Sequence, residues 1–143
     1  MNYQKIRAAV ENPLLTAFGA LSPAVPVFFD NITAAPLNSN TEHVRVNINF
    51  GLTNEPTLNS SVDDARGVVL IRIYTEKGKG PARNQTLVTS AVGVLETLND
   101  SAKTNAGVFF RVGQIEGPSF SSTETSPLFA STIDTSFVAT VLS

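Results

Sequence analysis

Residues 43–52 constrain the fold of this chain more than any other stretch, because apolar and polar side chains alternate there without a break. Arg45, Asn47 and Asn49 fall on one side of an extended chain. The residues on the other side are apolar, namely Val44, Val46, Ile48 and Phe50. A period of two is typical of a β-strand with one buried and one solvated face. The chain should therefore build a sheet that is covered on one side.

A second strand is predicted over residues 67–74, with the sequence GVVLIRIY. Its first half is apolar on both faces, which favours a central place in the sheet. A polar stretch from Thr53 to Arg66 separates it from the first strand, and this stretch exceeds the usual length of a connection. We therefore expect a long β-hairpin whose tip is a loop over residues 53–66.

Two amphipathic helices are predicted from apolar residues at helical spacing. The first covers residues 2–21, and Pro13 should kink it or restart it at Asn12. The second follows Pro81, which suits the start of a helix, and runs to Asn99. We expect Gly93 to let this second helix pack closely on the sheet.

Three further strands are predicted from short apolar or alternating runs. Residues 25–29 contain a proline and suit an edge strand. Residues 107–115 alternate, and a polar loop is expected over 117–126. Residues 127–142 alternate again, and their length implies a bulge or a bend. The expected fold is α+β, with a mostly antiparallel sheet of about five strands and two helices packed on one face.

Composition excludes several classes of protein. With 143 residues we expect a single domain over 1–143. The chain has no cysteine, which excludes disulfides, thiolate zinc sites and cysteine nucleophiles. A net charge of −2 without a basic run argues against binding DNA through its phosphates. There is no apolar stretch of membrane-spanning length and no signal peptide, so we expect a soluble protein used without export.

The densest basic patch in the sequence is formed by Arg72, Lys77, Lys79 and Arg83. It could contact an acidic partner surface or phosphates, or it could be a solvated edge. Gly78-Lys79-Gly80 does not match a phosphate-binding loop, because the spacing and the magnesium-binding hydroxyl are missing.

Three other positions invite a functional interpretation. Asp63 and Asp64 resemble half of a carboxylate pair, although loop solubility explains them more simply. His43, the single histidine, stands beside Glu42 and could act as a base, but no matching nucleophile motif is present. Phe109 is exposed by strand parity and could be buried by another subunit. We therefore predict no catalytic residue, no metal and no cofactor.

Two segments resemble the phage tail terminator-like proteins. One is the opening stretch from Tyr3 to Glu11, YQKIRAAVE. The other is the strand GVVLIRIY over 67–74, which runs into a glycine-bearing turn, KGKGPA over 77–82, and then a helix. The helix after Ala82 lacks an acidic residue near its start, and the last strand is richer in Ser and Thr than is usual in that family. Length and element order agree over nearly the whole chain.

The resemblance implies a structural virion protein. Such proteins form a ring, commonly a hexamer, that caps the tail tube and offers a surface to the head-tail connector or stopper protein. DNA passes through the lumen without sequence-specific binding. The loops 53–66 and 117–126 are candidates for the axial contacts. The implied location is the tail or neck of the virion, after assembly in the host cytoplasm.

Other functions stay open at this point. The chain could be another ring protein of the neck, or a tail-tube subunit. It could be a non-catalytic module that binds a ligand or a polypeptide on its sheet face. A small hydrolase that uses His43 is the remaining alternative. The sequence does not determine the ring number, the lining of the lumen or the face that meets the tube.

Overall fold

A computed structural model describes residues 3–21, 25–30, 42–54, 62–76, 81–100, 108–121 and 128–142. The predicted order of one helix, three strands, one helix and two strands is confirmed. The elements are α1 (Tyr3–Gly19), β1 (Val27–Phe28), β2 (His43–Asn54), β3 (Val62–Glu76), α2 (Ala82–Asp100), β4 (Val108–Ser121) and β5 (Leu128–Leu142).

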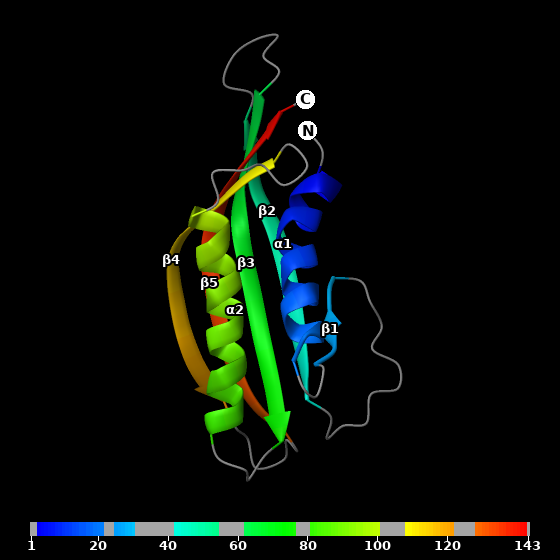
Figure 1. Ribbon diagram of the computed structural model, residues 1–143. Helices are drawn as coiled ribbons and strands as arrows, with labels where there is room; N and C mark the ends of the chain where they lie inside the picture. The colour runs from blue at the N-terminus through cyan, green and yellow to red at the C-terminus, as the bar shows by residue number, and fades with distance from the viewer. Residues whose placement is uncertain are drawn as a thin grey trace.

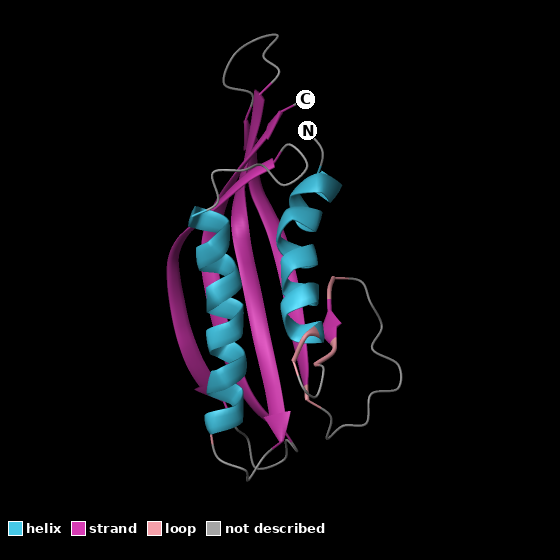
Figure 2. Cartoon of the chain, in the orientation of Figure 1, coloured by secondary structure: helices cyan, strands magenta, loops and turns pink. Residues whose placement is uncertain are grey.

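The strands form one five-stranded sheet in the order β1-β2-β3-β5-β4. β1 pairs parallel with β2, and every other neighbouring pair is antiparallel. β3 is central and β1 lies at an edge, as predicted from their sequences. The two helices lie side by side against one face of the sheet (Figures 1 and 2). The predicted α+β class is therefore confirmed.

The core lies between the helices and the sheet. The apolar stripe of α1 is fully buried there, with Ile6, Val10, Leu14 and Phe18 at 0% exposure. α1 continues through Pro13, so the prediction that the helix restarts at Asn12 is wrong. Burial of residues on both sides of the proline holds the turn together despite the hydrogen bond that proline cannot donate.

The pairing of β3 with β5 keeps one register over all 15 residues of each strand. The bulge expected in the last strand is therefore absent from β5. Register shifts occur instead on its partner β4, between Val112 and Ile115 and between Glu116 and Ser119. A further shift lies in β2, between Phe50 and Leu52. The register shifts thus fall in β2 and β4, and the pairing of β3 with β5 has none.

The two long loops are shorter than predicted. β2 extends to Asn54 and β3 begins at Val62, so half of the expected loop over 53–66 is strand. β4 extends to Ser121 and takes in the first part of the expected loop over 117–126. Polar residues continue these ladders because backbone hydrogen bonds do not depend on side-chain type. The remaining parts of the two predicted loops, 55–61 and 122–127, lie outside the described residues.

Two glycines play different parts in the packing. A Cβ on Gly67 would lie 2.0 Å from the Asn49 carbonyl oxygen, so only glycine fits where β3 passes the bulge of β2. A Cβ on Gly93 would meet nothing within 4 Å. The expectation that Gly93 allows α2 to approach the sheet is therefore wrong.

Candidate interaction surface

The sheet has a face that no described helix covers, and its centre is apolar. Here we call it the open face. Val68 on β3 is 42% exposed and Val138 on β5 is 36% exposed. The two valines are diagonal neighbours, because Val68 pairs with Ser136 and Val138 pairs with Arg66. The solvated side of an antiparallel sheet is usually polar, so two exposed valines at its centre mark a candidate contact surface.

Charged residues flank the valines on one side. Arg66 is exposed and lies in the same cross-strand row as Val138. Arg111 of β4 completes this row. Its guanidinium also donates hydrogen bonds to the carbonyl oxygens of Leu98, at 3.0 Å, and Phe110, at 3.1 Å.

Two charged rows follow on the other side of the valines. Asp134 of β5 lies directly opposite Glu116 of β4, and we call these two residues the acidic row. Arg45 of β2 lies directly opposite Arg72 of β3, and these two form the arginine row. Like charges directly opposite each other on a sheet are unfavourable. Both rows therefore favour contact with opposite charge.

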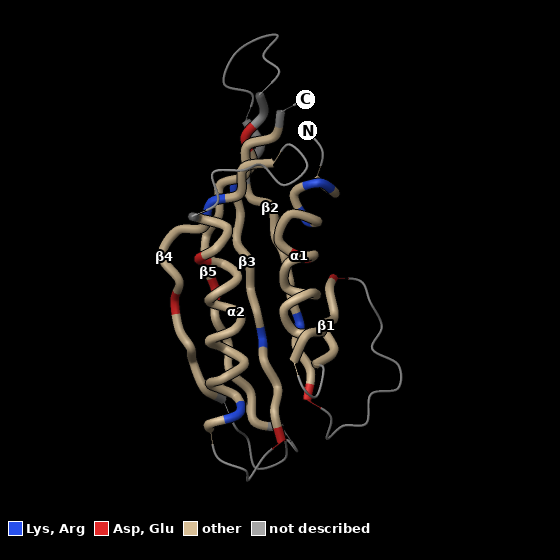
Figure 3. The backbone as a smooth tube through the Cα atoms, in the orientation of Figure 1, with Lys and Arg blue, Asp and Glu red and all other residues tan. Residues whose placement is uncertain are grey.

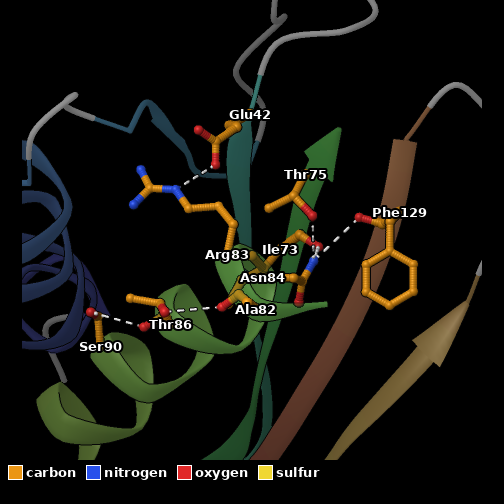
Figure 4. A network of polar contacts seen from close by, with 9 residues as sticks. All are labelled: Glu42, Ile73, Thr75, Ala82, Arg83, Asn84, Thr86, Ser90 and Phe129. Carbon is orange, nitrogen blue, oxygen red and sulfur yellow. Dashed lines mark hydrogen bonds and ion pairs between the residues drawn. The ribbon is translucent and has the colours of Figure 1, made fainter. Parts of the chain in front are cut away.

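The structure separates the residues of the predicted basic patch. Arg72 lies on the open face, whereas Arg83 lies in the first turn of α2 on the helix side. The Arg83 Nε donates a hydrogen bond of 2.9 Å to the carboxylate of Glu42, as Figure 4 shows. Lys77 and Lys79 lie outside the described residues. Arg72 and Arg83 therefore do not share one surface.

The predicted acidic and aromatic positions lie toward one end of the open face. Asp64 belongs to β3 and accepts a hydrogen bond of 2.8 Å from the Thr140 hydroxyl. Asp63 precedes it in the same strand, and its side chain lies outside the described part. Phe109 pairs with Thr140 and is half-buried, with the Arg111 guanidinium 5.9 Å from its ring centre. Asp64 and Phe109 therefore share a row beside Arg66 and Arg111.

His43 is buried within an aromatic cluster at the opposite end of the open face. Its ring stacks on Tyr74 with 4.6 Å between centroids, and Phe28 packs edge-on at 6.0 Å. Only 6% of His43 is exposed. This environment suits a packing role rather than access to a substrate.

An ion pair caps the edge of the sheet at β2, beyond the short strand β1. The Asp30 carboxylate accepts a hydrogen bond of 3.0 Å from the Ile48 N–H. Arg7 of α1 donates one of 3.1 Å to the Ile48 carbonyl and binds Asp30 at 2.6 Å. Both backbone groups of Ile48 are therefore satisfied by side chains. Such capping prevents another strand from pairing at this point.

The opposite edge of the sheet is capped at β4 by one amide side chain. Asn99, in the last turn of α2, accepts a hydrogen bond of 2.8 Å from the Val112 N–H. The Asn99 amide also donates one of 3.1 Å to the Val112 carbonyl. The amide thus takes the place of a neighbouring strand. The sequence does not reveal this contact, because Asn99 looks like an ordinary helix-terminal residue.

Burial and hydrogen bonding shift the two carboxyl groups near Arg7 in opposite directions. Burial alone would raise the pKa of Asp30. Bonds from the Ile48 N–H, the Asn47 amide and Arg7 outweigh it and lower that pKa. Burial raises the pKa of Glu11, with Arg7 opposing the shift and Asp30 adding to it. Asp30 is therefore held in its charged form at the sheet edge.

A buried amide joins α2 to the two central strands. Asn84 is 0% exposed, and its amide donates to the carbonyls of Ile73 and Phe129 and to the Thr75 hydroxyl (Figure 4). It also accepts a hydrogen bond from the Ser131 hydroxyl. Asn84 falls in phase with the buried apolar residues Leu87, Ala91 and Leu95. This phase is a sequence signal that could have identified it.

Charge is sparse along the helix side of the molecule (Figure 3). Within the described ranges, no group of three or more His, Asp or Glu residues is arranged to hold a metal ion. None of the described helices combines the length and apolar character needed to cross a membrane. The directly opposed like charges of the acidic row and the arginine row lie on the open face instead.

Comparison with known proteins establishes the fold and nothing finer. No protein-family model matches the chain, and no curated protein matches it. Thirty-seven chains of solved structures match it. One of them, a protein that carries only a serial designation, has a TM-score of 0.67 and 20% sequence identity. The match covers 99% of this chain and 96% of that one.

Proposed function

We propose that this chain is a structural subunit of a bacteriophage virion. It forms a ring that caps the tail tube and joins it to the head-side connector or stopper protein. Its partners are further copies of itself, the tail tube protein and the connector, and DNA passes through the lumen. This proposal follows the resemblance to tail terminator-like proteins, and it assigns the chain no catalysis and no cofactor.

The observation that carries this proposal is the projecting end of the β2–β3 hairpin. Residues 51–54 of β2 and 62–66 of β3 extend past the N-terminal turn of α1 (Figure 1). We call them the arm. An element that projects from one end of a subunit can reach along the axis of a ring into an adjoining ring. The arm therefore supports an axial contact with the tube.

The capped sheet edges support the same proposal. A terminator must bind the tube at one surface and prevent the addition of further tube subunits at its other surfaces. At Ile48 and Val112 the backbone groups are taken up by Asp30, Arg7 and Asn99. Strand addition at these points is blocked. A closed ring then requires side-chain surfaces that meet heterologously.

The test is growth of tail tubes from purified tube protein, viewed by electron microscopy, with and without this chain. We expect tubes of limited length with a ring at one end. Replacing residues 55–61 with a short Gly-Ser linker should leave the chain folded, because the pairing of β2 with β3 is retained, and should abolish capping. A wider deletion from Glu55 to Asp63 would also remove the first two residues of β3, so a loss of capping could then come from a damaged strand.

Substitution of exposed Leu15 by Ala on α1 is the matched control and should cap normally. Normal capping by the linker variant would remove this segment from the mechanism. Tubes that grow unchanged around the full chain would contradict the terminator function itself. Many copies along each tube would instead favour a tube subunit, and a few copies at the neck without capping would favour another neck ring.

The exposed valines of the open face favour one second candidate, a non-catalytic binding module. A ligand that binds the folded state raises the melting temperature by mass action. A thermal shift that Val68→Ser abolishes would support this alternative.

A further inference from the structure

We propose that the open face binds an extended segment of a partner polypeptide that carries an acidic, a basic and an apolar side chain at alternate positions. The acidic side chain faces the arginine row and the basic side chain faces the acidic row. The apolar side chain covers Val68 and Val138. This contact goes beyond tube capping and does not rest on it, because the proposed tube contact lies at the arm and not on the open face.

The pairing of β3 with β5 sets the order of the binding groups on the open face. Four successive rows pair Arg72 with Thr132, Leu70 with Asp134, Val68 with Ser136 and Arg66 with Val138. We call these residues the track. Read toward the arm, the track presents a cation, then an anion, then an apolar centre beside a second cation. No register shift interrupts it, so its rows are evenly spaced.

The charges of the track are not neutralised within the described part of the chain. Arg66, Arg72 and Asp134 make no ion pair or hydrogen bond there, and the recorded ion pairs lie at Asp30 and Glu42, away from the track. The arginine row and the acidic row each set like charges directly opposite one another, which is unfavourable. A segment that brings the opposite charge to each row relieves both repulsions.

The spacing of the rows favours an extended segment. Successive rows lie two residues apart along each strand, or about 7 Å. Alternate side chains of an extended segment repeat at the same distance, so three of them meet three rows in register. Helical residues four apart are separated by about 6 Å and fall progressively short of the rows. The hydroxyls of Thr132 and Ser136, which make no hydrogen bond in the described part, are available to the backbone of the segment.

The valines supply affinity and the charges supply register. Val68 is 42% exposed and Val138 is 36% exposed, so a side chain that covers both removes apolar surface from water. Exposed ion pairs contribute little free energy by themselves. Complementary charges instead determine which partner binds and in which position.

Two other occupants suit the track less well. A second copy that pairs face to face about Val68 sets Val138 of one copy against Asp134 of the other, so the valines do not all meet. A nucleic acid brings its phosphates against the acidic row as well as the arginine row. The alternation of acidic, basic and apolar side chains suits every row at once.

The test titrates the isotope-labelled full chain with the end-blocked peptide Ser-Glu-Ser-Lys-Ser-Val-Ser. The reverse sequence is titrated as well, because the segment can run in either direction along β3. Shifts of the backbone amide signals in NMR spectra locate the binding site, and we expect them along the track with one of these peptides. Peptides in which Glu and Lys exchange places should bind at least about tenfold more weakly, since each charge then meets its like.

Charge reversal in the chain tests the same contacts from the other side. Arg72→Glu alone and Asp134→Lys alone should each weaken binding of the original peptide about tenfold. The double variant should bind the original and the exchanged peptides about equally, because each row then holds one charge of each sign. Glu96→Lys makes the same change of charge as Asp134→Lys at an exposed site on α2. It is the matched control and should bind like the wild type.

Several results would overturn this proposal, once circular dichroism has shown that each variant is folded. They are the absence of shifts on the track, equal binding of the original and exchanged peptides by the wild type, and single variants that bind like the wild type. Larger shifts with a single-stranded oligonucleotide would overturn it in favour of a nucleic acid. A dimer that buries the open face would overturn it in favour of a second copy. The tube-growth assay tests capping separately, so the two ideas can fail independently.

Discussion

Gly67 and Gly93 lie in regular elements of the same chain but have opposite surroundings. The Ala substitution at Gly67 forces a Cβ against the Asn49 carbonyl and the Phe137 ring. We expect Gly67→Ala to lower the free energy of unfolding by about 1–3 kcal/mol. Gly93→Ala meets open space in α2 and should raise it by about 0.5–1 kcal/mol. Urea unfolding measures both, and effects of the same sign would contradict the close approach at Gly67.

Asn84 offers a second contrast at the residue scale, because its neighbour Gln85 carries the same amide group on the exposed side of α2. Asn84→Ala leaves the buried hydroxyl of Ser131 without its partner and removes three donated bonds. We expect a loss of about 2–3 kcal/mol in the free energy of unfolding. Gln85→Ala should stay within about 0.5 kcal/mol of the wild type. Equal losses would show that the Asn84 network contributes nothing specific.

At the scale of elements, the contact that joins α1 to the edge of β2 should make stability depend on pH. The pKa of Asp30 is lowered in the folded chain. Its stabilisation is therefore complete above the ordinary pKa of aspartate, about 3.9, and is lost as the pH falls through the lower folded value. Asp30→Asn should lower the free energy of unfolding by about 1–3 kcal/mol at neutral pH, and it should reduce the fall in stability at low pH. Unfolding titrations across the acid range measure it.

Glu11→Gln is the control for this experiment, because the pKa of Glu11 is raised in the folded chain. An ionised Glu11 destabilises the fold at neutral pH, and the cost disappears as the pH falls through its raised pKa. The variant should therefore equal or exceed the wild type at neutral pH and converge with it in acid. Parallel profiles for all three proteins would mean that neither carboxyl group is coupled to folding.

Features that depend on neighbouring residues could be predicted from the sequence, whereas features that depend on contacts between distant parts of the chain could not. The alternation in residues 43–52 lies within one element, so the strand and its buried face were predicted correctly. The ends of β2 and β3 were missed, because polar residues such as Asn54 continue a ladder that the opposite strand sets. The caps at Ile48 and Val112 join residues far apart in the chain. No local pattern encodes such contacts.

The candidate site shows the same contrast between local patterns, which were predicted, and contacts between distant residues, which were not. Arg72 was singled out from the sequence, and it lies in a charged row of the open face. Its grouping with Arg83 failed because β3 and α2 place the two side chains on opposite sides of the sheet. The actual neighbour of Arg72 is Arg45, from another strand. Register across the sheet, which a single sequence does not display, decides which charges meet.

At the scale of the whole molecule, the sheet is regular at its centre and irregular at its margins. Amides that exchange only through global unfolding should therefore belong to β3 and β5, whose pairing has no register shift. Amides of β4 beyond Val112, where the bulges lie, should exchange faster. Native-state hydrogen exchange measures this order. Protection in β4 equal to that in β3 would contradict it.

The unbroken pairing of β3 with β5 also determines how the chain would carry a mechanical load. A pull along the strands shears the ladder and is shared by all of its hydrogen bonds together, whereas a pull across them would open the bonds one after another. Both strands pass through the arm end of the molecule, so a force applied there runs along the strands. The direction in which the chain is stiffest is therefore the direction in which its arm points.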